Sequence, residues 1–114
     1  MENIEVRDMT SDDEYFVSTC THENESTEID ESAERRLCWL RANERLGLRV
    51  KVAVIDGRRI GFLYAMPIEL SPWGPLGQDL LVVPCLFVLD DSKGRGAGRA
   101  LLRAAEEEAR LQGL

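Results

Sequence analysis

The spacing of hydrophobic and polar residues changes along the chain, and this separates the expected strands from the expected helices. Ile4 to Arg7 alternates and predicts a short first strand, and Arg49 to Ile55 alternates again. Asp56-Gly57 is typical of a hairpin turn, so Arg59 to Met66 is expected to return antiparallel to the preceding strand. The nearly continuous apolar run from Asp79 to Leu89 predicts a third long strand, buried on both faces.

Three segments have features typical of helices. Ser11 followed by Glu14 matches a capping box and predicts a helix that continues to about Cys20. A second helix is expected from about Glu31 to Leu46, with one side formed by Cys38, Trp39, Ala42 and Leu46. A third, amphipathic helix is expected from about Gly96 to Gln112, with an inward face of Gly98, Leu101, Leu102, Ala105 and Ala109.

The connecting segments complete the expected architecture. Thr21 to Asp30 is polar and predicts a loop, and the proline-rich stretch Pro67 to Gln78 predicts an ordered loop. Pro84 cannot donate a ladder hydrogen bond, so it predicts a bulge or a broken ladder within the last strand. The order of elements favours an α/β (α+β) domain with a mainly antiparallel sheet and helices on both faces.

Composition limits the protein to one domain of ordinary character. The chain has 114 residues, of which 44% are hydrophobic and 31% charged. Neither an apolar run of about 18 residues nor a secretion signal is evident, so we expect no membrane association. The odd number of cysteines (Cys20, Cys38 and Cys85) favours a reducing cytoplasm. Their spacing, with His22 included, matches no zinc site, and no metal is expected.

Charge is unevenly distributed. The net charge of −7 makes nucleic acid an unfavourable partner, because an acidic protein repels phosphates. Ten acidic residues and no basic ones lie between Asp8 and Glu34, which predicts a solvated face able to attract a cationic molecule. The stretch from Lys93 to Arg103 has four basic residues and no acidic one, which predicts a local anion site.

The segment Lys93-Gly94-Arg95-Gly96-Ala97-Gly98-Arg99 lies between the last strand and the last helix. The first turn of a helix has unpaired N–H groups and a partial positive charge, and glycines allow a ligand to approach the backbone. Together with the flanking cations, this predicts a phosphate or pyrophosphate site. The spacing fits neither a dinucleotide fingerprint nor a P-loop. The alternative is a simple chain reversal in which Gly98 permits close packing.

This segment resembles the acetyl-CoA loop of the GNAT superfamily of N-acetyltransferases. In that family a Val is followed five residues later by Arg or Gln and then by a glycine-rich run, as Val88 here precedes Lys93 and Gly94 to Gly98. Lys93 departs from the pattern because it is neither Arg nor Gln. The order of elements is similar to the first two-thirds of the family fold. We therefore expect residues 1–114 to form a single, incomplete domain, lacking its C-terminal strands, which a further segment or a homodimer would complete.

The resemblance implies acetyl-CoA as the acyl donor and a primary amine of a small molecule or peptide as the acceptor. Backbone groups of Leu86, Phe87 and Val88 would bind the pantetheine arm, and N–H groups from Gly94 to Arg99 would bind the pyrophosphate. A neutral amine would attack the thioester directly, with the oxyanion held by a backbone N–H of the strand.

The general base is not evident, since Val82 occupies the position at which some family members have Glu. Tyr64, Glu69 and Asp79 are the candidates, and Tyr64 is alternatively a general acid. By analogy with family loops, the acceptor would contact Met66, Glu69, Trp73 and Gln78. Cys85 is better explained as a small buried hydrophobic residue than as an acyl carrier.

Two other functions remain open from the sequence. One is a CoA-binding or regulatory module without turnover, and the other is a structural half-domain that binds nothing. Binding of acetyl-CoA and release of its thiol would distinguish the three.

Overall fold

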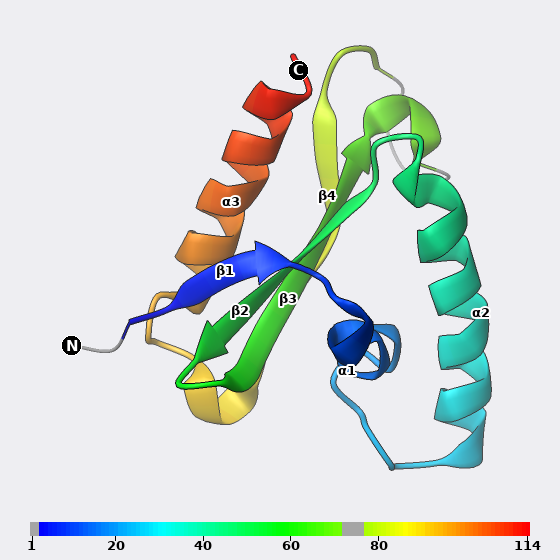
Figure 1. Cartoon of the computed structure of the whole chain (residues 1–114), viewed down its shortest axis with the longest axis vertical. Coiled ribbons are helices and arrows are strands. Elements are labelled where there is room, and N and C mark those ends of the chain that lie inside the picture. Colours follow the sequence, from blue (N-terminus) through cyan, green and yellow to red (C-terminus); the bar gives the residue numbers. More distant parts are fainter. Residues whose placement is uncertain (1–2, 72–76) are drawn as a thin grey trace.

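The computed structural model describes residues 3–71 and 77–114. Its four strands form one antiparallel sheet in the order β1-β2-β3-β4. They are β1 (Glu5–Asp8), β2 (Arg49–Ile55), β3 (Arg58–Pro67) and β4 (Leu81–Val88). The helices are α1 (Glu14–Ser18), α2 (Thr27–Glu44) and α3 (Ala97–Leu111), with single 3-10 turns η1 (Ser11–Asp13), η2 (Ile68–Leu70) and η3 (Asp90–Ser92). This arrangement confirms the expected fold class (Figure 1).

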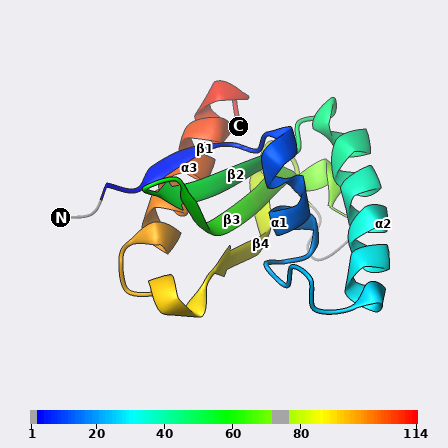
Figure 2. The same cartoon turned by 60° about the horizontal axis from the view of Figure 1, so that its bottom comes forward.

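Successive side chains of a strand point to opposite faces of the sheet. Here both faces have apolar residues, which form two separate core clusters. Phe62 and Met66 of β3 face α1 and α2, whereas Leu63 and Ala65 face α3. The two helical layers therefore cover opposite faces of the sheet (Figure 2). Phe62 and Leu63 are completely buried, and each stabilises the fold by roughly 2 kcal/mol through removal of apolar surface from water. No helix within residues 3–71 and 77–114 has the length and apolarity needed to cross a membrane.

The β2–β3 hairpin has the turn that the sequence predicts. Asp56 and Gly57 both adopt positive φ angles, 50° and 80°, as a type I′ turn requires. That backbone twist matches the twist of the two strands, so the turn sets the register in which Val52 opposes Phe62.

The expectation that the last strand is buried on both faces is wrong. In the described structure β4 pairs only with β3, and its Val83, Pro84 and Leu86 are exposed. The bulge expected at Pro84 is confirmed, because the register shifts between Tyr64, opposite Cys85, and Met66, opposite Val82. Pro84 has no N–H group to donate, and this is tolerated because β4 is an edge strand of the described sheet.

The first two helices differ from their predicted bounds and faces. Helix α2 begins at Thr27, four residues before the expected start, because the hydroxyl of its N-cap Ser26 accepts a 3.1 Å hydrogen bond from the amide of Ile29. The buried residues of α2 are Ala33 and Leu40, while Cys38, Ala42 and Leu46 are exposed. The predicted inward side was therefore wrong for those three residues, because packing against the sheet selected a different side of the helix.

Helix α3 agrees with its predicted bounds but buries an acidic residue. Leu102, expected inside, is 44% exposed, whereas Glu108 is buried and pairs with Lys51 at 2.8 Å. Burial alone would raise the pKa of Glu108, but hydrogen bonds from Lys51 and Gln112 lower it below its usual value. This ion pair joins α3 to β2 on the face of the sheet that α3 covers.

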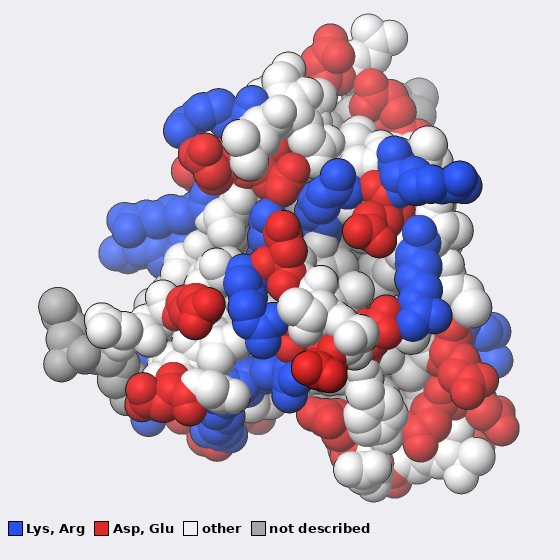
Figure 3. Space-filling model, in the orientation of Figure 1, with Lys and Arg blue, Asp and Glu red and all other residues white. Residues whose placement is uncertain are grey.

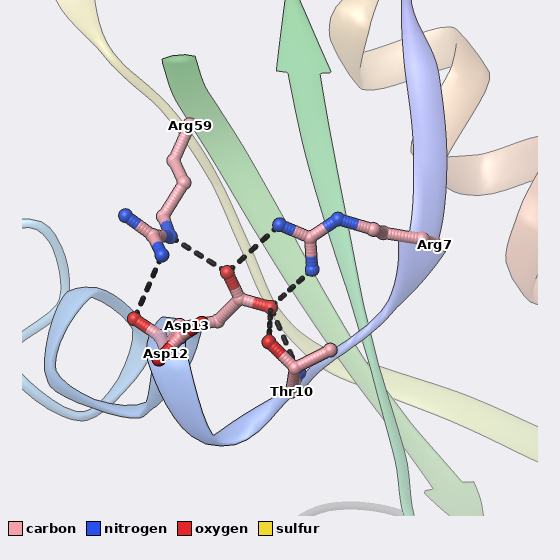
Figure 4. A network of polar contacts seen from close by, with 5 residues as sticks. All are labelled: Arg7, Thr10, Asp12, Asp13 and Arg59. Carbon is pink, nitrogen blue, oxygen red and sulfur yellow. Dashed lines mark hydrogen bonds and ion pairs between the residues drawn. The ribbon is translucent and has the colours of Figure 1, made fainter. Parts of the chain in front are cut away.

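The strongest polar contacts of the N-terminal half surround Asp13 (Figure 4). Its carboxylate accepts hydrogen bonds from Arg59 Nε at 2.6 Å and from the amide of Thr10 at 2.8 Å, and it contacts both Nη atoms of Arg7. Thr10 and Asp13 thus cap the first turn in place of the predicted Ser11 and Glu14. Burial would raise the pKa of the Asp13 carboxyl, but these hydrogen bonds hold it well below its usual range.

The expectation of a solvated acidic face between Asp8 and Glu34 is therefore wrong for Asp13, which is completely buried. Most of the remaining acidic residues of this stretch are exposed or half-buried. On the face shown in Figure 3, acidic and basic side chains are interspersed. This face therefore shows no extensive patch of one sign (Figure 3).

Asp13→Asn is expected to destabilise the protein by about 2–4 kcal/mol, because Arg7 and Arg59 lose a buried counter-charge. The Asp13 pKa is depressed on folding, so its contribution is present above the unfolded value of 3.8 and decreases as the pH falls below it. Urea unfolding at pH 7 and near pH 3 measures both effects. Asp12→Asn is the control, because only the backbone carbonyl of Asp12 accepts from Arg59. Equal stability of the two variants at pH 7 would contradict the assignment.

Candidate functional site

The loop between β4 and α3 leaves open space in front of its glycines. Gly94 and Gly96 have φ angles of 84° and 88°, a left-handed conformation that favours glycine, and Gly96 caps α3. A Cβ atom added at Gly94, Gly96 or Gly98 would meet no other atom within 4 Å. Packing within the protein therefore does not explain these three glycines.

The backbone at the start of α3 presents unpaired donors. Within the described parts of the chain, the amides of Gly96, Ala97, Gly98 and Arg99 donate no hydrogen bond to the protein. The first amide of this turn that does so is Ala100, which donates to the Gly96 carbonyl at 3.0 Å. Free N–H groups at the positive end of a 15-residue helix are suited to an anion.

Two carboxylates that the sequence analysis did not consider lie beside this loop. Lys93 pairs with Asp90 at 2.9 Å, and Arg58 pairs with Asp91 at 2.8 Å. Hydrogen bonds from Arg58 and from Ser92 lower the pKa of Asp91. Both ion pairs are largely exposed and so are worth little in water, which leaves Lys93 able to exchange its partner for a phosphate. The Arg58–Asp91 pair joins η3 to the first residue of β3.

The strand that leads into the loop is exposed along its outer edge. Leu86 is 40% exposed, whereas Phe87 stacks on Phe62 with ring centroids 6.5 Å apart, and Val88 packs against the core below α3. β4 and α3 run side by side from the glycine loop (Figure 1). A depression of about 360 Å³ lies between them at the far end, and Asp79, Val83, Leu102 and Glu106 are among its lining residues.

Of the predicted catalytic residues, Tyr64 lies on the opposite face of the sheet from α3. Its ring packs edge-on against Trp39 with centroids 6.2 Å apart, and it lies directly opposite Cys85 of β4. Burial, together with the neighbouring Cys85, raises the pKa of Tyr64. The hydroxyl therefore stays protonated at neutral pH, which suits a proton donor better than a base.

Glu69 and Asp79 are brought together at the end of the sheet where β3 leaves and β4 begins. The amide of Asp79 lies 3.5 Å from Glu69 Oε2, and both side chains are exposed. Among the expected acceptor contacts, Gln78 is exposed, but Met66 is completely buried in the core, so that expectation is wrong. Trp73 lies outside the described residues.

A comparison with family models identifies the domain. The model of the acetyltransferase (GNAT) family matches residues 5–114. The chain belongs to the GNAT acetyltransferase family. Membership in this family supports an acyltransferase activity. The glycine loop lies between β4 and α3, as the sequence resemblance predicted. A comparison with curated protein sequences found no match.

Solved GNAT structures share the fold of this domain. The aminoglycoside N-acetyltransferase AAC(6')-Iy, bound to a CoA bisubstrate analogue, has a TM-score of 0.74 and 18% identity over 97% of this chain and 74% of that chain. The protein yncA from Salmonella typhimurium, with acetyl-CoA, has a TM-score of 0.70 and 22% identity over 96% and 65%. A ribosomal-protein-alanine N-acetyltransferase from Brucella melitensis has a TM-score of 0.66 and 25% identity over 95% and 68%.

The GNAT domain has a further glycine whose role the sequence analysis missed. A Cβ atom at Gly61 of β3 would lie 2.6 Å from the carbonyl oxygen of Phe87 on β4. Only glycine therefore permits this approach of the two strands. A lone glycine within a strand is the signal that identifies such a position.

Other features of the GNAT domain do not belong to this site. A depression of about 420 Å³ lies where η1, α2 and β2 meet, with Thr10, Glu14, Arg41 and Arg49 among its lining residues. The glycine loop contributes nothing to it. Across residues 3–71 and 77–114, no three His, Cys, Asp or Glu side chains cluster as metal ligands would.

Gly61→Ala is expected to destabilise the domain by about 1–3 kcal/mol, since Phe87 must move away from the new methyl group. Gly98→Ala is the matched control, because its new Cβ meets no atom and alanine favours a helix. Denaturant unfolding of both variants measures the difference. A Gly61→Ala protein as stable as the control would disprove the close approach.

Proposed function

We propose that this chain is an acetyl-CoA-dependent N-acetyltransferase that acetylates a primary amine of a small molecule or peptide. The observation that carries the proposal is the row of unpaired amides from Gly96 to Arg99, opening onto free space beside the exposed edge of β4. Family membership and CoA-containing structures of the same fold support it.

The residues of this chain fit acetyl-CoA, which supplies the acetyl thioester when bound. The amides between Gly94 and Arg99 and the rim cations Lys93, Arg95 and Arg99 would hold the pyrophosphate. Backbone groups of Leu86, Phe87 and Val88 would hydrogen-bond the pantetheine arm as an added strand does. The apolar side chains exposed along β4 and α3 suit the aliphatic part of that arm.

Proton transfer falls to a small set of side chains. Tyr64 would donate a proton to the departing thiolate, because its raised pKa keeps its hydroxyl protonated. Glu69 and Asp79, which lie together and exposed, would attract the protonated amine and accept its proton through water. The net charge of −7 further favours a cationic acceptor over an anionic one.

A CoA-binding or regulatory module without turnover is the alternative, and it shares every feature of the loop. Calorimetric titration with acetyl-CoA tests binding, and thiol release in the presence of an amine panel tests turnover. Binding without thiol release for any amine favours the module. The exposed apolar edge of β4 is a surface on which a second copy of the chain or a further segment could pair, as expected from the sequence. The homodimer, the further segment and the cytoplasmic location stay predictions.

Gly98→Glu is expected to weaken acetyl-CoA binding at least about tenfold, because a carboxylate enters the anion site. Gly98→Ala at the same position is the control and should bind within about threefold of the unchanged chain. Gly98 has no positive φ, so neither variant strains the backbone. Calorimetry gives the affinities, and thermal melts verify folding. Equal affinities of all three proteins would reject the loop as the pyrophosphate site.

Tyr64→Phe is expected to lower kcat about tenfold or more while leaving the Kd of acetyl-CoA unchanged, since only the proton donor is lost. Steady-state thiol release and calorimetry measure the two quantities. Glu69→Gln and Asp79→Asn, assayed in parallel, indicate which carboxylate assists the amine. An unchanged kcat in Tyr64→Phe would remove this residue from the mechanism.

A further inference from the structure

The segment that follows α1 lies along β4 on the face of the sheet opposite α3. The ring of His22 packs edge-on against Phe87 with centroids 6.3 Å apart. Cys20 and Cys85 pack against the same core cluster, which includes Phe62 and Tyr64, and each thiol shifts the pKa of the other. Both cysteines are half-buried free thiols. Cys20 and His22 are two residues apart, as are Cys85 and Phe87, so the segment and the strand meet over a short length with matching spacing.

A third group completes the surroundings of Cys20. Arg36 of α2 contacts the Cys20 sulfur with Nη1, and the same atom lies 3.3 Å from the Ser18 carbonyl. A guanidinium fixed beside a sulfur stabilises the thiolate, which is the nucleophilic form of cysteine. The hydrogen bond with Cys85 and the charge of Arg36 lower the pKa of Cys20 to about 6, against the opposing effect of burial.

Cys20 is accessible from solvent. A depression of about 340 Å³ lies over Cys20, and Ser18, His22, Glu28 and Arg36 are among its lining residues. Cys85 lies on the strand side of Cys20, where it also contacts the Tyr64 hydroxyl. A small oxidant can therefore reach Cys20 from one side while the second thiol remains on the other.

We propose that Cys20 and Cys85 form a peroxide-reactive dithiol that closes to a disulfide. The Cys20 thiolate attacks one oxygen of hydrogen peroxide, the O–O bond breaks, and hydroxide leaves, which produces a sulfenic acid at Cys20. The hydroxide takes up the proton that the Cys20 thiol had released and becomes the first water. The Cys85 sulfur then attacks the Cys20 sulfur, the S–O bond breaks, and the Cys85 proton departs with the oxygen as a second water. The two thiols supply both electrons, and an added dithiol reductant restores them.

The disulfide would join the segment after α1 covalently to β4. Cys38 is the internal control, because it is exposed on α2 and lies outside this cluster. The inference does not depend on acetyl transfer, because the chemistry involves only the two thiols, Arg36 and peroxide.

The experiment treats the purified chain with hydrogen peroxide at pH 7, blocks remaining thiols with an alkylating agent, and maps peptides without reduction. The expected product is a Cys20–Cys85 linked peptide, with a loss of about two mass units that dithiothreitol reverses. Cys38 should remain alkylated. Oxidation of Cys38 before Cys20, or a Cys20 sulfenic acid that persists without forming the link, would overturn the proposal.

Three variants test the roles separately. Cys85→Ser should accumulate sulfenic acid at Cys20, trapped by dimedone, and form no link. Arg36→Gln should slow the oxidation of Cys20 at pH 7 about three- to tenfold, since it removes the charge that stabilises the thiolate. Arg35→Gln is the matched control on the same helix, where Arg35 contacts only the exposed Ser32 hydroxyl. Equal rates for the two arginine variants, with folding verified by circular dichroism, would also overturn the proposal.

Discussion

The buried carboxylate of Asp13 is the contact on which the arrangement of the N-terminal half depends. It joins Arg7 of β1 to Arg59 of β3 and caps the first helical turn through Thr10. A buried ion without partners costs several kcal/mol, so these groups are stable only in one arrangement. The contact thus determines where α1 begins and, through α1, where the segment from Cys20 to His22 meets β4.

A second buried charge performs a similar task at the other face of the sheet. Lys51 joins Glu108 of α3 to Asp8 of β1, with distances of 2.8 and 2.5 Å. Burial alone would lower the pKa of Lys51, but its two carboxylate partners raise it. The Lys51–Glu108 contact fixes where α3 lies along the sheet. It therefore also fixes the position of the glycine loop, which directly precedes α3.

The bulge at Pro84 connects the two proposed chemistries. Because the register shifts there, Val82 and Cys85, three residues apart, both face the layer of α1 and α2. Beyond the bulge, Cys85 points toward Cys20 and Tyr64, while the outer edge near Leu86 stays open for a ligand. One strand therefore serves a thiol pair on one face and a proposed cofactor groove along its edge.

The sequence by itself determined the elements that depend on local physics. Alternation predicted β1 and β2, the Asp56-Gly57 turn predicted the return of β3 in a hairpin, and the glycine spacing after Val88 predicted the loop and its family. These features depend on neighbours in the chain, so a short window of residues contains the information.

Only the tertiary structure decided which charged residues are buried and which apolar ones are not. Asp13 and Glu108 read as surface residues, yet each is buried beside a basic partner from a distant strand. The β4 strand read as fully buried, yet its apolar edge is exposed because no described strand pairs with it. The meeting of Cys20, Arg36 and Cys85 likewise joins three separate segments. Such pairings depend on how elements pack in three dimensions, and the local sequence does not contain that information.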